Sequence, residues 1–113
     1  MITIDKLQQF GADTREGLGR CMNNEAFYLR LVNMGLTDKN FAGLEEAVRQ
    51  GDRKAAFEAA HALKGVMGNL SLTPLFESIS ELTELLRADR DADYPALVSR
   101  ILQQREKLLQ LQD

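Results

Sequence analysis

The sequence predicts an all-α protein that folds as an antiparallel up-down four-helix bundle with additional short N-terminal helices. Apolar residues recur every three or four positions along most of the chain, which is the spacing of the buried face of an amphipathic helix. No run of alternating β-branched residues predicts a strand. Turn-forming residues divide the pattern into helices of fair length joined by short connections, an organisation typical of up-down bundles.

The first third of the chain predicts helices that pack across the bundle or one of its ends. An apolar stripe near the N-terminus ends at Gly11, where a first short helix can stop. Asp13 or Thr14 can cap a second short helix. Asn24, like the asparagine before it, can cap a third helix, and Gly35 is a suitable end for that helix.

The next two helices meet at a clear boundary. Thr37 restarts the apolar pattern, which continues to Gly51. Two interpretations stay open here, because the segments on either side of Gly35 can also form one kinked helix. Asp52 directly follows Gly51 and is a good N-cap for the next helix, which we expect to reach Leu70.

The last two helices are separated by a charged segment. Ser71 or Thr73 can cap the first of them, and Pro74 is tolerated in its first turn because an N–H there has no helical partner. The segment RADRDAD predicts a turn. Asp93, close to a proline, opens the final helix, whose apolar positions share one face.

The length and composition indicate one globular domain. A chain of 113 residues can bury a core without disulfides or metals, and we expect N-terminal helices in residues 1–36 and the bundle core in residues 37–113. The formal net charge is −3, and the basic residues are scattered rather than clustered. Because nucleic-acid binding needs a basic stripe, we expect a protein partner and no nucleic acid.

The compartment follows from what the sequence lacks. Its single cysteine, Cys21, cannot form an internal disulfide, which favours a reducing compartment. No apolar run approaches the roughly 20 residues that cross a bilayer, and the N-terminus has no signal-peptide pattern. We therefore expect a cytoplasmic protein that does not associate with membranes.

The helix predicted over residues 52–70 carries the only histidine, His61. Side chains three, four or seven positions away lie on the same stripe of a helix. This stripe contains a lysine pair, an aromatic ring and two glycines, with a glutamate at its edge (Lys54, Phe57, Glu58, Lys64, Gly65 and Gly68). The opposite side is apolar (Ala55, Ala56, Ala59, Leu63, Val66, Met67 and Leu70). His61 is therefore predicted to point away from the core.

The composition of this stripe suits an acceptor of phosphoryl groups. Glycine inside a helix costs about 1 kcal/mol relative to alanine, so helix stability does not explain Gly65 and Gly68. Both leave room beside the imidazole for a bulky group or for the backbone of a partner. Lys64 can bring its ammonium to an anion attached to the His61 ring, because side chains three positions apart are neighbours on a helix.

Other chemistry has weaker support. Glu58 and His61 have the Glu-x-x-His spacing of di-iron bundles, but those sites need a second copy and more glutamates, so we expect no metal. A hydrolase would need a serine or cysteine activated by the histidine, and nothing in the sequence brings Cys21 or a serine to it. The histidine can also be structural or an incidental surface residue, which would leave the two glycines unexplained.

The segment HALKGVMGNL, from His61 to Leu70, resembles the phosphorylation motif of histidine-containing phosphotransfer (HPt) domains, which is His-x-Leu-Lys-Gly followed by a short spacer and often Asn-Leu-Gly. The upstream segment GLGRCMNNEAFYLRLVNMGL is similar to the lead-in helices of that family, and the resemblance continues downstream to a helix that ends near Arg87. Ser71 departs from the pattern, because a glycine is frequent there in the family.

The resemblance implies roles for the stripe. His61 would be phosphorylated, Lys64 would stabilise the phosphoryl group, and Gly65 with Gly68 would let a partner approach. The partner would dock on this face, which also contains Lys54, Phe57 and Glu58. The partners implied are receiver domains of response regulators and a hybrid histidine kinase, and the protein would be a monomer and a phosphocarrier without kinase activity. No cofactor is expected on this chain, because the chain has no glycine-rich nucleotide loop and Mg²⁺ would belong to the receiver domain.

Three alternatives stay open. The chain can be a helical interaction domain that carries no phosphate. It can be the phosphoacceptor domain of a chemotaxis-type kinase separated from a longer chain, although Met1 favours a complete small protein. It can be a helical metalloenzyme, which would contain stoichiometric metal when purified.

Overall fold

The computed structural model describes residues 1–111, and in that range it contains seven helices and no strand. The all-α prediction is therefore confirmed. The helices are α1 (Ile4–Phe10), α2 (Thr14–Arg20), α3 (Glu25–Leu36), α4 (Asn40–Arg49), α5 (Arg53–Asn69), α6 (Thr73–Arg87) and α7 (Tyr94–Gln110).

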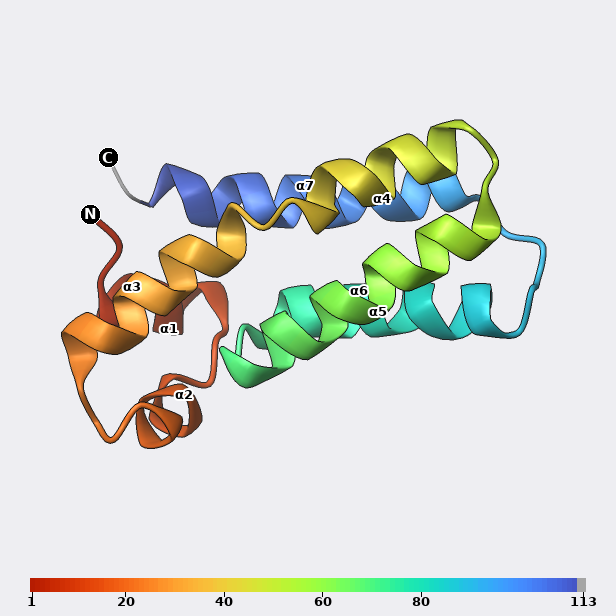
Figure 1. The fold of residues 1–113 in the computed structure, drawn as a ribbon. Helices are drawn as coiled ribbons and strands as arrows, with labels where there is room; N and C mark the ends of the chain where they lie inside the picture. The colour runs from red at the N-terminus through yellow and green to blue at the C-terminus, as the bar shows by residue number, and fades with distance from the viewer. Residues whose placement is uncertain (112–113) are drawn as a thin grey trace.

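The last four helices form the predicted antiparallel up-down bundle (Figure 1). Each packs beside the next in sequence, and α7 closes the ring by packing on α4. The connections are short, so successive helices run in opposite directions. Helices α5 and α6 form one side of the bundle, and α4 and α7 form the opposite side.

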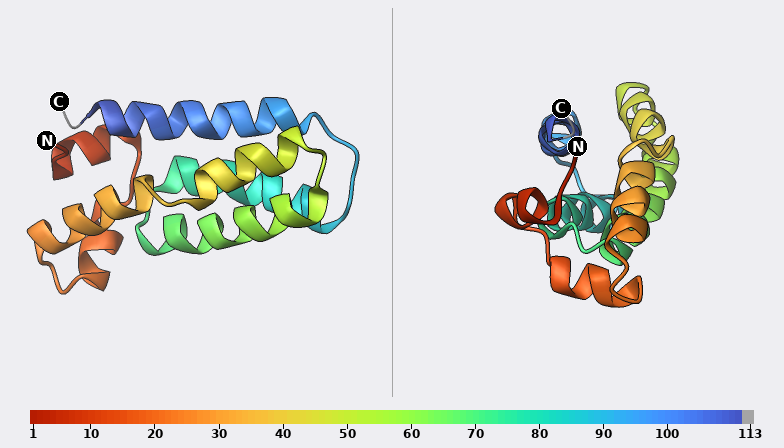
Figure 2. Two further views of the ribbon diagram at one scale, coloured as in Figure 1. Left: turned by 45° about the horizontal axis from the view of Figure 1, so that its top comes forward. Right: turned by 90° about the vertical axis from the view of Figure 1, so that its left-hand side faces the viewer.

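The N-terminal helices gather at one end of the bundle (Figures 1 and 2). Glycine at position 35 lets α3 approach the end of α5, because a Cβ there would lie only 2.5 Å from Leu70 Cδ1. Helices α3 and α4 are separate, and the single kinked helix is wrong. The chain turns between them because the Thr37 hydroxyl donates to Met34 O, while Asp38 Oδ1 accepts from Asn40 N at 2.8 Å.

Four predicted N-caps are confirmed. The side chains of Asp13, Asn24, Asp52 and Asp93 each accept a hydrogen bond from a backbone N–H in the first turn of their helix. These helices begin where the sequence predicts because a short polar side chain satisfies a donor that the helix leaves free.

Two predicted helix starts are wrong. Thr37 is the C-cap of α3, and α4 begins after Lys39 without a side-chain cap. Neither Ser71 nor Thr73 caps α6, whose N-cap is Leu72. Ser71 instead has a positive φ of 57°, in the left-handed region that favours glycine.

The core confirms most of the apolar face predicted for the histidine helix. The α5 side chains buried in the bundle share one side of the helix (Ala56, Ala59, Ala60, Leu63 and Met67), and Leu70, its C-cap, is buried too. Ala55 and Val66 are only half-buried, and Ala60 is buried although it was not predicted to be. Within residues 1–111, no helix is both long and apolar enough to cross a membrane.

Candidate functional site

His61 lies in the middle of α5 with its side chain exposed. The register of this helix is set at its start, where Asp52 Oδ1 accepts a hydrogen bond from Ala55 N at 3.0 Å. Leu63, two residues after the histidine, is fully buried. His61 therefore lies on the outer side of the bundle, as the helical projection predicts.

An aromatic ring packs beside the imidazole. The rings of Phe57 and His61 are stacked, with an angle of 9° between their planes. The guanidinium of Arg87, from α6, lies over the Phe57 ring, 5.0 Å from its centroid. Phe57 is therefore a half-buried platform that connects the histidine to a cation on the neighbouring helix.

Lys64 lies one turn beyond the histidine and has a partner on α6. Lys64 Nζ is 3.7 Å from Glu84 Oε2, and Arg87 Nε is 3.3 Å from the same oxygen. The Lys64 side chain is 31% exposed and that of Glu84 is 56% exposed, so both remain in contact with solvent. One carboxylate thus contacts both Lys64 of α5 and Arg87 of α6.

A shallow hollow of about 310 Å³ lies beside the histidine, between α5 and α6. Side chains and backbone of both helices line it (His61, Lys64, Gly65, Gly68, Asn69 and Phe76). The hollow brings together four residues of the predicted stripe. It is open to solvent and has room for an anionic group bound to the imidazole.

The two glycines have different surroundings. A Cβ built on Gly65 would meet no atom within 4 Å, so packing within the chain does not require a glycine there. A Cβ on Gly68 would lie 3.0 Å from Phe76 Cε1, so this glycine lets the Phe76 ring pack against α5. The sequence interpretation attributed both glycines to partner approach, whereas Gly68 also has a structural reason within the chain.

Lys54 and Glu58 are both exposed, and Lys54 belongs to a second hollow that adjoins the stack at Phe57. This hollow has a volume of about 540 Å³ and is lined from α5, α6 and the loop that follows (Arg53, Lys54, Phe57, Leu86, Arg87 and Asp89). Three of its six lining residues are cationic and one, Asp89, is acidic, so this hollow next to the histidine has charges of both signs.

The loop after α6 neutralises one of these cations. Arg53 Nη1 donates to Asp89 Oδ1 at 2.9 Å, and Nη2 donates to Asp91 Oδ1 at 2.8 Å. These hydrogen bonds, first that of Asp91 and then that of Asp89, raise the pKa of the Arg53 guanidinium. Arg53 therefore fastens the loop to the start of α5.

The N-terminal helices hold the other end of α5. Arg20 Nη1 donates to Gly68 O at 2.8 Å, which also accepts from Ser71 N, and to Asn69 O at 3.2 Å. Both oxygens belong to the last turn of the helix, where carbonyls lack partners within the helix. The same nitrogen donates to Ser71 Oγ at 2.9 Å, and this hydroxyl donates to Glu16 Oε1 at 2.7 Å. The turn after the histidine helix is thereby fixed by α2.

Sequence reasoning missed three residues of α6 that contact the stripe or line its hollow, which are Phe76, Glu84 and Arg87. The spacing of Glu84 and Arg87 places them on one face of a helix, outside the apolar stripe of α6. That signal identifies an exposed charged pair. It cannot tell which residues of α5 the pair meets, because this depends on the register between two helices.

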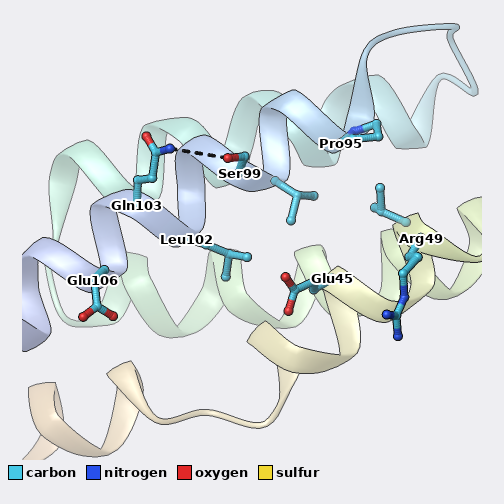
Figure 3. A pocket seen from close by; sticks show the side chains of 9 residues that line it. Glu45, Arg49, Pro95, Ser99, Leu102, Gln103 and Glu106 are labelled. Carbon is cyan, nitrogen blue, oxygen red and sulfur yellow. Dashed lines mark hydrogen bonds between the residues drawn. The ribbon is translucent and has the colours of Figure 1, made fainter.

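A larger groove of about 590 Å³ lies on the other side of the bundle (Figure 3). All its lining residues come from α4 and α7, and its floor is apolar, with Val48 and Leu102. Its cation, Arg49, is paired with Glu46. The groove contains no histidine or cysteine, and among residues 1–111 no three His, Cys, Asp or Glu side chains are grouped so as to hold a metal ion.

The fold and the site define the class of the protein as a helical bundle that displays its one histidine on the surface. The family model of the Hpt domain matches residues 36–113, and the chain belongs to this family. Hpt domains are phosphocarriers that interact with receiver domains in phosphorelays, and they are not kinases.

The family match begins at residue 36. The similarity of residues 17–36 to the lead-in helices of the family therefore stays an expectation, and helices α1 and α2 lie outside the match, as does nearly all of α3. No curated protein and no solved structure matches the chain.

Proposed function

We propose that this protein is a phosphocarrier of a multistep phosphorelay and that His61 accepts and donates the phosphoryl group. The observation that carries the proposal is the exposed imidazole beside a hollow that also contains Lys64 and the open backbone at Gly65. A phosphoryl acceptor needs an accessible nucleophile, a nearby cation and room for the donor. This face of the chain offers all three.

The transfer step uses an unprotonated ring nitrogen of His61 as the nucleophile. The nitrogen attacks the phosphorus of an aspartyl phosphate on a receiver domain. The N–P bond forms, the bond between phosphorus and the aspartate oxygen breaks, and the aspartate leaves as a carboxylate with the electron pair. The reverse step passes the group to another receiver. Lys64 stabilises the phosphoryl group by its positive charge.

The partners proposed are receiver domains of response regulators and of a hybrid histidine kinase. The surface proposed for their docking follows α5 and contains both hollows. Its residues are those of the histidine stripe (Lys54, Phe57, Glu58, His61, Lys64, Gly65 and Gly68). We propose that the receiver brings the Mg²⁺ that assists the reaction and that the carrier works as a cytoplasmic monomer.

Incubation with a phosphorylated receiver tests the proposal. We expect acid-labile, base-stable phosphate on the wild-type protein and none on His61→Gln, with unchanged helicity. Ser99→Ala, which removes a hydroxyl from α7, is the control and retains the label. Acid-labile phosphate on His61→Gln would contradict the assignment, because the chain has no second histidine.

A further inference from the structure

Glu84 occupies a position on α6 from which it contacts both Lys64 and Arg87. Its Oε2 lies 3.7 Å from Lys64 Nζ and 3.3 Å from Arg87 Nε. Arg87 in turn lies over Phe57, which stacks on His61. The carboxylate therefore competes with any anion on the imidazole for the ammonium that would stabilise it.

We propose that Glu84 is a positioning residue of the phosphocarrier site, which holds Lys64 while His61 is unphosphorylated and releases it to the phosphoryl group. The inference rests on the proposed function of His61. After the release, Glu84 keeps its contact with Arg87, so the carboxylate still has a cationic partner.

The strength of the contact suits such an exchange. Lys64 and Glu84 are exposed at 31% and 56% and are 3.7 Å apart, and ion pairs of this kind are weak. A phosphoryl group carries more negative charge than a carboxylate and accepts stronger hydrogen bonds from an ammonium. Lys64 therefore has a partner in each state, and the phosphoryl group is the better one.

A consequence is that Glu84 sets the phosphotransfer equilibrium. By holding Lys64, it favours the unphosphorylated carrier and makes the phosphohistidine a better donor. Removal of its charge should favour the phosphohistidine. The effect should be about twofold to fivefold, which is the range of an exposed ion pair.

Glu84→Gln tests this inference when the equilibrium of phosphoryl exchange with one phosphorylated receiver is measured. We expect the equilibrium to shift toward phosphorylated His61 by that factor and the half-life of the phosphohistidine to increase. Glu81→Gln is the matched control, because Glu81 is an exposed glutamate of the same helix that lies 4.0 Å from Arg100. We expect this variant to behave as the wild type.

A double-mutant cycle with Lys64→Ala shows whether Glu84 acts through the lysine. We expect Glu84→Gln to have no effect on the equilibrium in the Lys64→Ala background. An equal shift in both backgrounds, or no shift in the wild-type background, would overturn the inference and leave the role of His61 intact. If the wild-type protein accepts no phosphate from any receiver, the proposed function itself fails, and the role of Glu84 fails with it.

Discussion

The imidazole of His61 and the phenyl ring of Phe57 lie one helical turn apart and nearly parallel, with their centroids separated by 5.6 Å. An exposed histidine without a neighbour samples several rotamers, whereas a ring on its flank favours those that keep the stack. The geometry of the nucleophile therefore depends on a side chain that takes no part in the bond-making step.

Phe57→Ala should slow phosphoryl transfer to His61 by a few-fold, because the imidazole loses the ring that limits its rotamers. The rate measured with one phosphorylated receiver checks this, together with side-chain NMR couplings of His61. Phe57→Tyr keeps the ring and should restore the rate. If Phe57→Ala and the wild type have the same rate and couplings, the stack does not orient the imidazole.

Lys64→Ala should shorten the lifetime of the phosphohistidine and slow its formation, because the phosphoryl group loses its nearest cation. The free energy of unfolding should change by less than about 0.5 kcal/mol, since the lysine is partly exposed and its ion pair is weak. Lys107→Ala, at an exposed position of α7, is the control and should leave the lifetime unchanged. Equal lifetimes in the wild type and Lys64→Ala would exclude a role for Lys64.

Gly65→Ala should separate stability from function. The new methyl group meets no atom of the chain within 4 Å, and alanine is better than glycine in a helix by about 1 kcal/mol, so the protein should become more stable. Transfer should nevertheless slow, because the methyl group enters the space left for the receiver.

Gly43→Ala is the matched control for this prediction. It also lies inside a helix, α4, and has no atom within 4 Å of the added Cβ. Thermal or denaturant unfolding should show the same gain in stability for both variants. Only Gly65→Ala should slow phosphoryl transfer. If the two variants transfer at the wild-type rate, the glycine at position 65 does not serve docking.

Tyr28→Phe should change how stability depends on pH. Burial, with smaller contributions from Cys21 and Asp13, raises the pKa of Tyr28 to about 12, above its value of about 10 in the unfolded chain. The unfolded state therefore loses its proton first, and about 2 to 3 kcal/mol of stability that is present below pH 10 is lost between about pH 10 and 12. Tyr28→Phe should abolish the loss of stability that is due to Tyr28.

At neutral pH the same variant should be less stable by about 1 kcal/mol, since the Tyr28 hydroxyl donates to Leu70 O at 2.7 Å. Denaturant unfolding at several pH values checks both effects. Tyr94→Phe is the control. It also removes a tyrosine hydroxyl, but the protein should still lose stability above pH 10, because Tyr28 is unchanged. Identical pH profiles for the wild type and Tyr28→Phe would contradict the assignment of the alkaline loss.

The sequence predicted most readily what local interactions determine. Asp52 caps α5 through a backbone N–H three residues away, and the alternation of faces along α5 follows from helix geometry alone, so the exposure of His61 could be inferred. The start of α6 could not, because Ser71 interacts with Glu16 and Arg20 of a distant helix rather than with its own helix.

Only the part of the site that lies on α5 could be predicted from the sequence, for a similar reason. Residues on α5 have a fixed spacing, so Phe57, Lys64 and Gly65 could be placed beside the histidine. Glu84 and Arg87 belong to another helix, and their contacts depend on how side chains interlock between α5 and α6. That register is a property of the packed bundle and leaves no local pattern in the chain.

The hydrogen bonds from Arg20 to the end of α5 bear on the choice of a minimal fragment for biochemical work. A fragment that starts at residue 36 would contain everything that the family match contains, but it would leave the carbonyls of Gly68 and Asn69 without that donor. The last turn of α5 would fray, and with it one wall of the hollow next to His61. Weak transfer by such a shortened protein would then reflect a damaged helix end and not the wrong partner.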